Sequence, residues 1–379
     1  MNTRKRRVPL LAALAAGAVA TGTLVLTGAG GSASDAAPAA ARTALSPRAG
    51  QWQSTPVPVA KGDLTAVAAL SATQAWAVGY RLTSTNQVEA LALRWDGTSW
   101  KQQSTLPPNS FPQALAVRAA GDIWSVGTTT AHWNGTSWTA HDLARDPNGR
   151  VVPDAVATTS DGKAWTVGRA VPQSVKNAVP AVQSWDGSAW RRQSLPDVGK
   201  GELTGLTVIA PDDIWAVGAA YATDGAEQTA LLLHFDGTSW KRVAAPAARK
   251  GEHRWLAGVT ATAAGDVWAV GGAVTEGSER PFAVRWDGEQ WSTAPTPDVP
   301  DGRLRAVGRG GDGTLWAVGG KGAVSLALRW DAQQRRWSQA PDPGVVIRGF
   351  SAVPGTGGLW TVGIAKRGDL VPAATRYGG

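Results

Sequence analysis

The chain contains one unit that occurs seven times, and this repeat constrains the fold more than any other feature. Its clearest mark is the pattern Trp-x-Val-Gly, whose successive tryptophans lie 41 to 53 residues apart. The seven tryptophans of this first aromatic position are Trp76, Trp124, Trp165, Trp215, Trp268, Trp316 and Trp360. Such a period accommodates four short strands with their connections, which is typical of a β-propeller blade.

Two further aromatic positions follow within the unit. An aromatic residue precedes an Asp-Gly or Asn-Gly pair, as in Trp95-Asp96-Gly97, and a tryptophan such as Trp100 usually follows five residues after it. The dipeptide predicts a tight hairpin, because Asn, Asp and Gly tolerate the backbone that such turns require. We expect the first-position tryptophans to pack between neighbouring blades and the other two positions to face each other across the hairpin.

The two ends of the repeat region complement each other. The last unit stops after its third strand, with Tyr377 in the second aromatic position, and so lacks a fourth strand. Residues 51–54 (Gln-Trp-Gln-Ser) resemble residues 99–102 (Ser-Trp-Lys-Gln), which begin the fourth strand of the first unit. We therefore predict an all-β fold over residues 51–379, a seven-bladed β-propeller of four-stranded blades whose last blade is closed by the N-terminal strand.

The first 34 residues match a secretion signal. Four basic residues at positions 4–7 precede an apolar run that reaches about Thr27, and small residues follow it. Residues 35–50 are rich in Ala, Pro and Ser and predict a disordered linker. We expect a secreted, extracellular protein without a membrane span after signal cleavage; an uncleaved apolar run would instead leave an N-terminal membrane anchor.

Composition removes several classes of function. The chain has no cysteine, which excludes disulfides, a thiol nucleophile and a cysteine metal site. Loss of the four basic residues of the signal would lower the formal net charge from +8 to +4, so the charge does not favour a nucleic-acid partner. We find no phosphate-binding loop and no HExxH, GxSxG or EF-hand pattern. We expect a monomer with no cofactor, no metal and no nucleic-acid partner.

The repeat resembles the kelch repeats and the wider galactose oxidase central-domain family. In that family a glycine pair ends the second strand, an aromatic residue precedes the last turn and a tryptophan begins the last strand; Gly271-Gly272 and Gly319-Gly320 match the glycine pair. The units are also partly similar to tectonin-type lectin propellers. Both resemblances imply a propeller, but the copper oxidase activity of the first family needs a cysteine-linked tyrosine, which this chain cannot form.

The connections predict where binding occurs. Within a blade, the turns that join the first two and the last two strands lie on one face, and the other connections lie on the opposite face. The first set looks tight, whereas the second includes long irregular loops, for example residues 80–90, 141–153, 169–182 and 244–255. Irregular loops on a rigid scaffold usually carry the binding residues, so we expect the site on this long-loop face.

The strongest candidate for that site is Trp255, the one tryptophan outside the three repeated positions, with His253 and Arg254 beside it. The alternative is a tryptophan folded over the adjacent loop. Four further ligand-binding candidates are expected on the same face: Tyr80, Arg81, Tyr221 and Arg305.

These features favour a non-enzymatic module that binds an extracellular protein or envelope partner through the long-loop face. A carbohydrate-binding, lectin-like propeller is the alternative, because aromatic rings suit sugar faces. A glycan-active hydrolase or lyase is the second alternative, with Tyr80 or Tyr221 as the nucleophile and nearby arginines to bind the substrate. Similar pockets in every blade would favour the lectin, and a carboxylate of raised pKa at the mouth of the central channel would favour the enzyme.

Overall fold

A computed structural model describes residues 50–378, apart from residues 104, 173–176, 223–226, 323 and 367–369. The predicted signal and nearly all of the predicted linker lie outside these described residues, so both stay predictions. No helix within the described ranges is long and apolar enough to cross a membrane.

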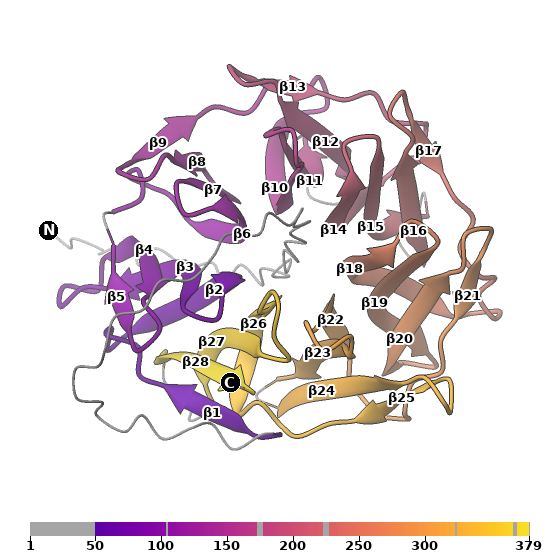
Figure 1. Cartoon of the computed structure of the whole chain (residues 1–379). Coiled ribbons are helices and arrows are strands. Elements are labelled where there is room, and N and C mark those ends of the chain that lie inside the picture. The colour runs from indigo at the N-terminus through magenta and orange to yellow at the C-terminus, as the bar shows by residue number, and fades with distance from the viewer. Residues whose placement is uncertain are drawn as a thin grey trace, which may run out of the picture.

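The described residues form seven four-stranded antiparallel sheets arranged in a ring, as predicted (Figure 1). Blades 1 and 2 contain β2 (Gly62–Ser71), β3 (Gln74–Leu82), β4 (Val88–Trp95) and β5 (Trp100–Gln102), then β6 (Pro112–Ala119), β7 (Asp122–Gly127), β8 (Thr130–Trp133) and β9 (Trp138–His141). Blades 3 and 4 contain β10 (Arg150–Thr158), β11 (Ala164–Val171), β12 (Val179–Trp185) and β13 (Trp190–Arg192), then β14 (Gly201–Ala210), β15 (Asp213–Tyr221), β16 (Gln228–Phe235) and β17 (Trp240–Arg242).

Blades 5 and 6 contain β18 (His253–Ala263), β19 (Asp266–Thr275), β20 (Ser278–Trp286) and β21 (Trp291–Thr293), then β22 (Leu304–Arg309), β23 (Leu315–Lys321), β24 (Val324–Asp331) and β25 (Arg336–Gln339). Blade 7 contains β26 (Val345–Ala352), β27 (Leu359–Ala365), β28 (Pro372–Tyr377) and β1 (Trp52–Thr55).

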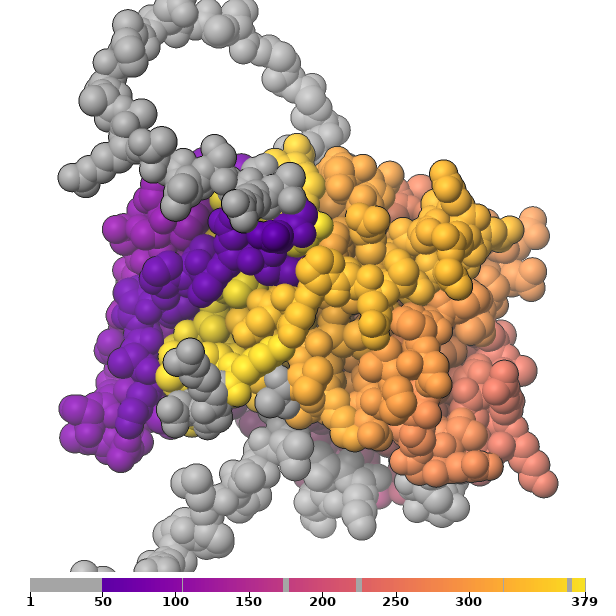
Figure 2. Space-filling view, turned by 90° about the horizontal axis from the view of Figure 1, so that it is seen from below, coloured from indigo at the N-terminus to yellow at the C-terminus, as the bar shows by residue number. Residues whose placement is uncertain are grey.

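The predicted closure of the ring is confirmed. Strand β1 pairs antiparallel with β28, with Trp52 opposite Tyr377, and so completes blade 7. The indole Nε1 of Trp52 also donates a hydrogen bond of 2.9 Å to the carbonyl of Pro341. Figure 2 shows the indigo N-terminal segment packed beside the yellow C-terminal segment. Both ends of the repeat region are thereby paired within one sheet of the ring.

The repeated tryptophans are packing residues between blades. In every case the first-position tryptophan of one blade contacts the aromatic pair of the next blade, at centroid distances of 4.5 to 6.4 Å. The cycle ends at Trp360 of blade 7, which lies 5.0 Å from both Trp95 and Trp100 of blade 1. Burial of each indole removes a large apolar area from water, so these contacts stabilise the ring.

The innermost strand of each blade carries a β-bulge followed by a small residue. In β14 the ladder skips Thr204 between Leu203 and Gly205, and each other innermost strand has the same irregularity at the matching position. A Cβ at Gly205 would lie 3.0 Å from the carbonyl oxygen of Ala257 in the next blade. The small residues therefore allow neighbouring innermost strands to approach closely.

The lengths of the connections differ in part from the prediction. Strand β3 continues to Leu82 and β4 begins at Val88, so the loop expected over residues 80–90 covers only residues 83–87. Conversely, the first turns of blades 3, 6 and 7 are not as short as expected; that of blade 6 spans residues 310–314. The loop over residues 83–87 is short because backbone pairing extends beyond the apolar pattern that marked the strands in the sequence.

Candidate functional site

The innermost strands begin on the long-loop face, and the charged and tyrosine side chains at their entries form a group that we call the inner rim. It comprises residues at the start of the innermost strands and the residues that face them from neighbouring strands: Asp63, Tyr80, Asp154, Arg169, Glu202, Tyr221, Glu279, Arg303, Arg305 and Arg348. Because the ring brings all seven entries together, residues far apart in the sequence meet here.

One half of the inner rim, over blades 5, 6, 7 and 1, has more cations than anions. Arg348 Nε lies 3.2 Å from Asp63 Oδ2, and Arg303 Nη1 lies 3.7 Å from Glu279 Oε1. Arg305, in the bulge of β22, makes no hydrogen bond or ion pair with the described residues. Three guanidinium groups thus face two carboxylates.

Burial and the repulsion between neighbouring arginines shift the pKa values of ionisable side chains in this half of the inner rim. Burial and the charges of Arg303 and Arg348 lower the pKa of Arg305 to about 10 despite the attraction of Glu279, which leaves Arg305 protonated at neutral pH. Burial raises the pKa of Asp63 to about 6 despite the attraction of Arg348. The cationic excess of this half is therefore partly desolvated, and an added anion would relieve it.

The opposite half of the ring, over blades 3 and 4, has an excess of carboxylates. Arg169 Nη1 lies 2.7 Å from Asp154 Oδ2 and 3.0 Å from Glu202 Oε2, so one cation serves two anions. Burial, and after it the charge of Glu202, raise the pKa of Tyr221. Burial and, to a smaller extent, the charge of Glu202 raise the pKa of Asp154 to about 7. The rim is therefore electrically asymmetric across the ring.

Burial raises the pKa of three inner-rim carboxylates, Asp63, Asp154 and Glu279. Glu279 lies 3.7 Å from Arg303, and the other two are poorly placed for acid–base chemistry. Asp63 is 5 % exposed and Asp154 is 4 % exposed, and each is paired with an arginine of the protein. Burial also raises the pKa of both Tyr80 and Tyr221. A tyrosine nucleophile needs an easily formed phenolate, so these shifts run opposite to the requirement of the hydrolase alternative.

The leading predicted residue, Trp255, was expected in the loop over residues 244–255, but it lies in β18, the innermost strand of blade 5, where it pairs with Gly272. A Cβ on Gly272 would lie 2.3 Å from Trp255 Cζ2, so the second glycine of this pair provides the space for the indole. Trp255 is half-buried against its own sheet.

Some of the other predicted residues lie in the inner rim, and the rest bind other groups of the protein. Arg254 is buried, forms an ion pair with Glu252 at 2.7 Å, and donates hydrogen bonds to the Pro246 and Ala247 carbonyls. His253 Nδ1 accepts a hydrogen bond from the backbone of Gln228, and Arg81 pairs with Glu89. Tyr80, Tyr221 and Arg305 lie in the inner rim, whereas Arg254 and Arg81 are engaged elsewhere. The ligand-binding role of all seven stays a prediction.

Most members of the inner rim were not among the predicted site residues, among them Asp154, Arg169 and Arg303. A signal for some of them exists in the sequence. When the strand entries are aligned on the small residue after the bulge, the bulge position holds Thr, Gln or Ala in four blades, but Asp154, Arg305 and Arg348 in the other three. A charged residue at the bulge position therefore indicates a member of the inner rim.

Nothing in the described part of the chain favours a metal site, because it contains no group of three or more His, Asp or Glu side chains that could hold an ion. The copper chemistry of the galactose oxidase family therefore has no ligand set among these residues.

Comparisons with known proteins support the fold. No protein-family model and no curated protein matches the chain. Among solved structures, the chain is similar to "YCF48 bound to D1 peptide", with 14 % identity, a TM-score of 0.55, and coverage of 88 % of this chain and 97 % of that one. It is also similar to the WD40 propeller domain of Doa1, with 10 % identity, a TM-score of 0.59, and coverage of 86 % of this chain and 96 % of that one. A third similar structure is streptogramin B lyase, with 12 % identity, a TM-score of 0.57, and coverage of 86 % of this chain and 97 % of that one. These similarities show a β-propeller fold; kelch-like or tectonin-like membership stays a prediction.

Proposed function

We propose that this protein is an exported, non-enzymatic interaction propeller that binds an acidic segment of a protein partner at the inner rim. The observation that carries the proposal is Arg305, a half-buried guanidinium with two arginines near it and no carboxylate in ion-pair contact among the described residues. Desolvated cations without such a contact are costly, and an anionic ligand would offset that cost. The similar structure of YCF48 is bound to a D1 peptide, which is consistent with such a role for this fold.

The electrostatic asymmetry of the rim suggests how a peptide would be oriented. An extended segment that crosses the ring would place its acidic residues over Arg305 and Arg348 and its basic residues over Asp154 and Glu202. Complementary charge improves specificity and the association rate more than it improves affinity.

Arrays of short peptides with graded net charge test the proposal directly. We expect the wild-type chain to prefer peptides with an acidic cluster, and Arg305→Glu to weaken their binding at least about tenfold, equivalent to about 1.4 kcal/mol. Arg242→Glu is the matched control, because Arg242 is exposed on the outer strand β17. Equal binding by Arg305→Glu and Arg242→Glu, or no preference for acidic peptides, would contradict the proposal.

Export rests on the N-terminal sequence. Replacement of the basic residues at positions 4–7 by glutamine should retain the protein inside the producing cell, whereas the unaltered chain should be recovered outside it or in its envelope. Equal recovery of both forms outside the cell would remove this part of the proposal.

A further inference from the structure

A pocket of about 770 Å³ lies between blades 5 and 6 on the face opposite to the inner rim. Its walls include the first turn of blade 6, residues 310–314, and the last turn of that blade, residues 332–335. Blade 6 has two extra residues between its paired tryptophans, Trp330 and Trp337, compared with Trp95 and Trp100 of blade 1. The volume lies in the range of about 300 to 1,000 Å³ that is usual for small-molecule sites.

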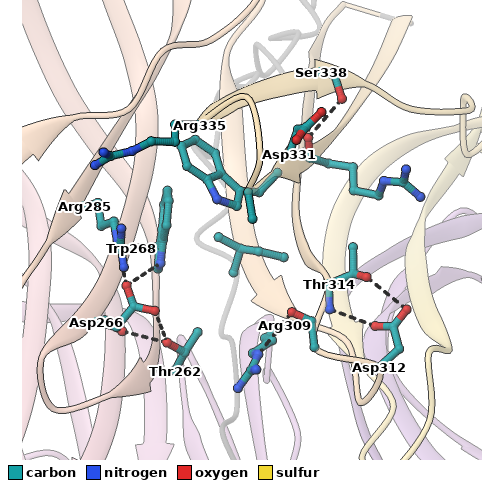
Figure 3. A pocket seen from close by; sticks show the side chains of 15 residues that line it. Thr262, Asp266, Trp268, Arg285, Arg309, Asp312, Thr314, Asp331, Arg335 and Ser338 are labelled. Atoms are coloured by element: carbon teal, nitrogen blue, oxygen red, sulfur yellow. Dashed lines mark hydrogen bonds and ion pairs between the residues drawn. The ribbon is translucent and has the colours of Figure 1, made fainter.

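Four arginines and three aspartates line this pocket: Arg285, Arg309, Arg329, Arg335, Asp266, Asp312 and Asp331. In Figure 3, Thr262 and Asp266 lie on one side, Thr314 and Asp312 lie on the other, and Arg309 lies between them. The formal charge of the lining is +1, from four arginines and three aspartates, so its electrostatics fit a ligand with few negative charges. A polyphosphate would bring several negative charges close to three carboxylates.

The carboxylates are largely engaged by the protein, whereas most of the guanidinium groups are not. Asp266 pairs with Arg285 Nε at 2.6 Å, and Asp312 accepts hydrogen bonds from the backbone and hydroxyl of Thr314. Asp331 Oδ1 accepts hydrogen bonds from two backbone amides of its own turn.

The other three arginines of the pocket, unlike Arg285, form no ion pair with a carboxylate among the described residues. Among the described residues, the Arg309 side chain donates a hydrogen bond only to the carbonyl of Gly313. The side chains of Arg329 and Arg335 are exposed and have no hydrogen-bond or ion-pair partner among the described residues. Three cations in the pocket are thus available to an anion, and arginine binds a carboxylate through two parallel hydrogen bonds.

Arg335 also has an unusual backbone. Its φ angle is 50°, in the left-handed region that favours glycine. A long cationic side chain therefore occupies a turn position where glycine would be less strained.

The other lining groups favour a ligand with hydroxyl groups. Trp330 is half-buried and packs edge-on against the buried Trp268, with centroids 4.5 Å apart. The second carboxylate oxygen of Asp331 has no partner among the described residues, so it can accept a hydrogen bond from a hydroxyl. An indole beside acceptors and arginines suits the apolar face, hydroxyls and carboxylate of an acidic sugar.

We propose that this pocket binds an acidic oligosaccharide that contains uronic acid units, with its sugar carboxylates bound by the exposed guanidinium groups of Arg329 and Arg335 and a sugar ring packed against Trp330. The single net charge favours one carboxylate per sugar over a more highly charged ligand. This site is separate from the inner rim and does not depend on the function proposed for it.

The pocket can be tested by calorimetric titration of the full chain with a galacturonic acid trisaccharide, and with its methyl ester as the uncharged comparison. We expect saturable binding of the acid, and binding of the ester at least about tenfold weaker. Arg335→Gly should weaken binding at least about fivefold without loss of thermal stability, because glycine suits the turn. Arg329→Ala should weaken it to a similar extent.

Two control variants show whether binding depends on this pocket. Glu276 has a φ of 52° in a turn on the opposite face, so Glu276→Gly makes the same backbone change and should leave binding unaltered. Arg305→Glu should also leave it unaltered, because Arg305 belongs to the inner rim. Unchanged binding by Arg335→Gly, equal binding of the acid and its ester, or no binding of the acid would overturn the proposal. Competition by an acidic peptide at equal affinity would also overturn the choice of a sugar.

Discussion

The closure of the ring by β1 leads to a quantitative prediction for Trp52. This residue is half-buried, its ring lies 5.2 Å from Tyr377 and 6.4 Å from Trp316, and its indole donates to the Pro341 carbonyl. Removal of a fully buried tryptophan costs about 3–5 kcal/mol, so half of that is about 2 kcal/mol. The lost hydrogen bond adds about 1 kcal/mol. We therefore expect Trp52→Ala to lower the free energy of unfolding by about 2–3 kcal/mol.

The assay is urea denaturation followed by circular dichroism, supported by the thermal midpoint, which should fall by about 5 °C. Gln53→Ala is the matched control, because Gln53 is exposed on the same strand and should have little effect. Trp52→Phe retains an aromatic ring but not the indole N–H, and should lie between the two. If Trp52→Ala is as stable as Gln53→Ala, the last blade is not held closed by this strand, and the reasoning fails.

Two further predictions concern pH and packing. In the folded chain the pKa of Asp154 is about 7 and that of Asp63 is about 6, above the ordinary value near 4. The folded chain therefore binds protons more tightly than the unfolded chain does. Its free energy of unfolding should fall as the pH rises from about 4.5 to about 7.5. Urea midpoints measured across this range should show a shallower decline for Asp154→Asn; an identical decline would contradict the assignment. Gly258→Ala should lower the free energy of unfolding by about 1–3 kcal/mol, because the added Cβ would lie 2.7 Å from the backbone oxygen of Arg305. Gly265→Ala is the control and should have little effect, because no atom lies nearer than 3.7 Å to its Cβ. Equal thermal midpoints for the two variants would refute the close approach of the innermost strands.

The architecture was predictable because its determinants recur locally in the chain. The spacing of the Trp-x-Val-Gly pattern predicted the number of blades, and the hairpin dipeptides predicted the last turn of most blades. The match between residues 51–54 and 99–102 predicted the closure, which the pairing of Trp52 with Tyr377 confirms. Each of these signals needs only a few neighbouring residues and is strengthened by repetition.

The candidate site was only partly predictable, because its contacts join blades that are distant in the sequence. Arg348 and Asp63 are 285 residues apart and meet only because the ring closes. Trp255 was notable as a departure from the repeat, but its position against Gly272 depends on strand register rather than on composition.

The sequence by itself determined the repeating unit, the number of blades, the closing strand and the packing role of the repeated tryptophans, since each follows from a pattern within one unit or between two similar units. Only the tertiary structure decided which charges meet at the inner rim, that Arg254 is engaged internally while Arg305 is not, and that a pocket lies between blades 5 and 6. The physical reason is that pairing and desolvation depend on distances across the ring, which no local pattern encodes.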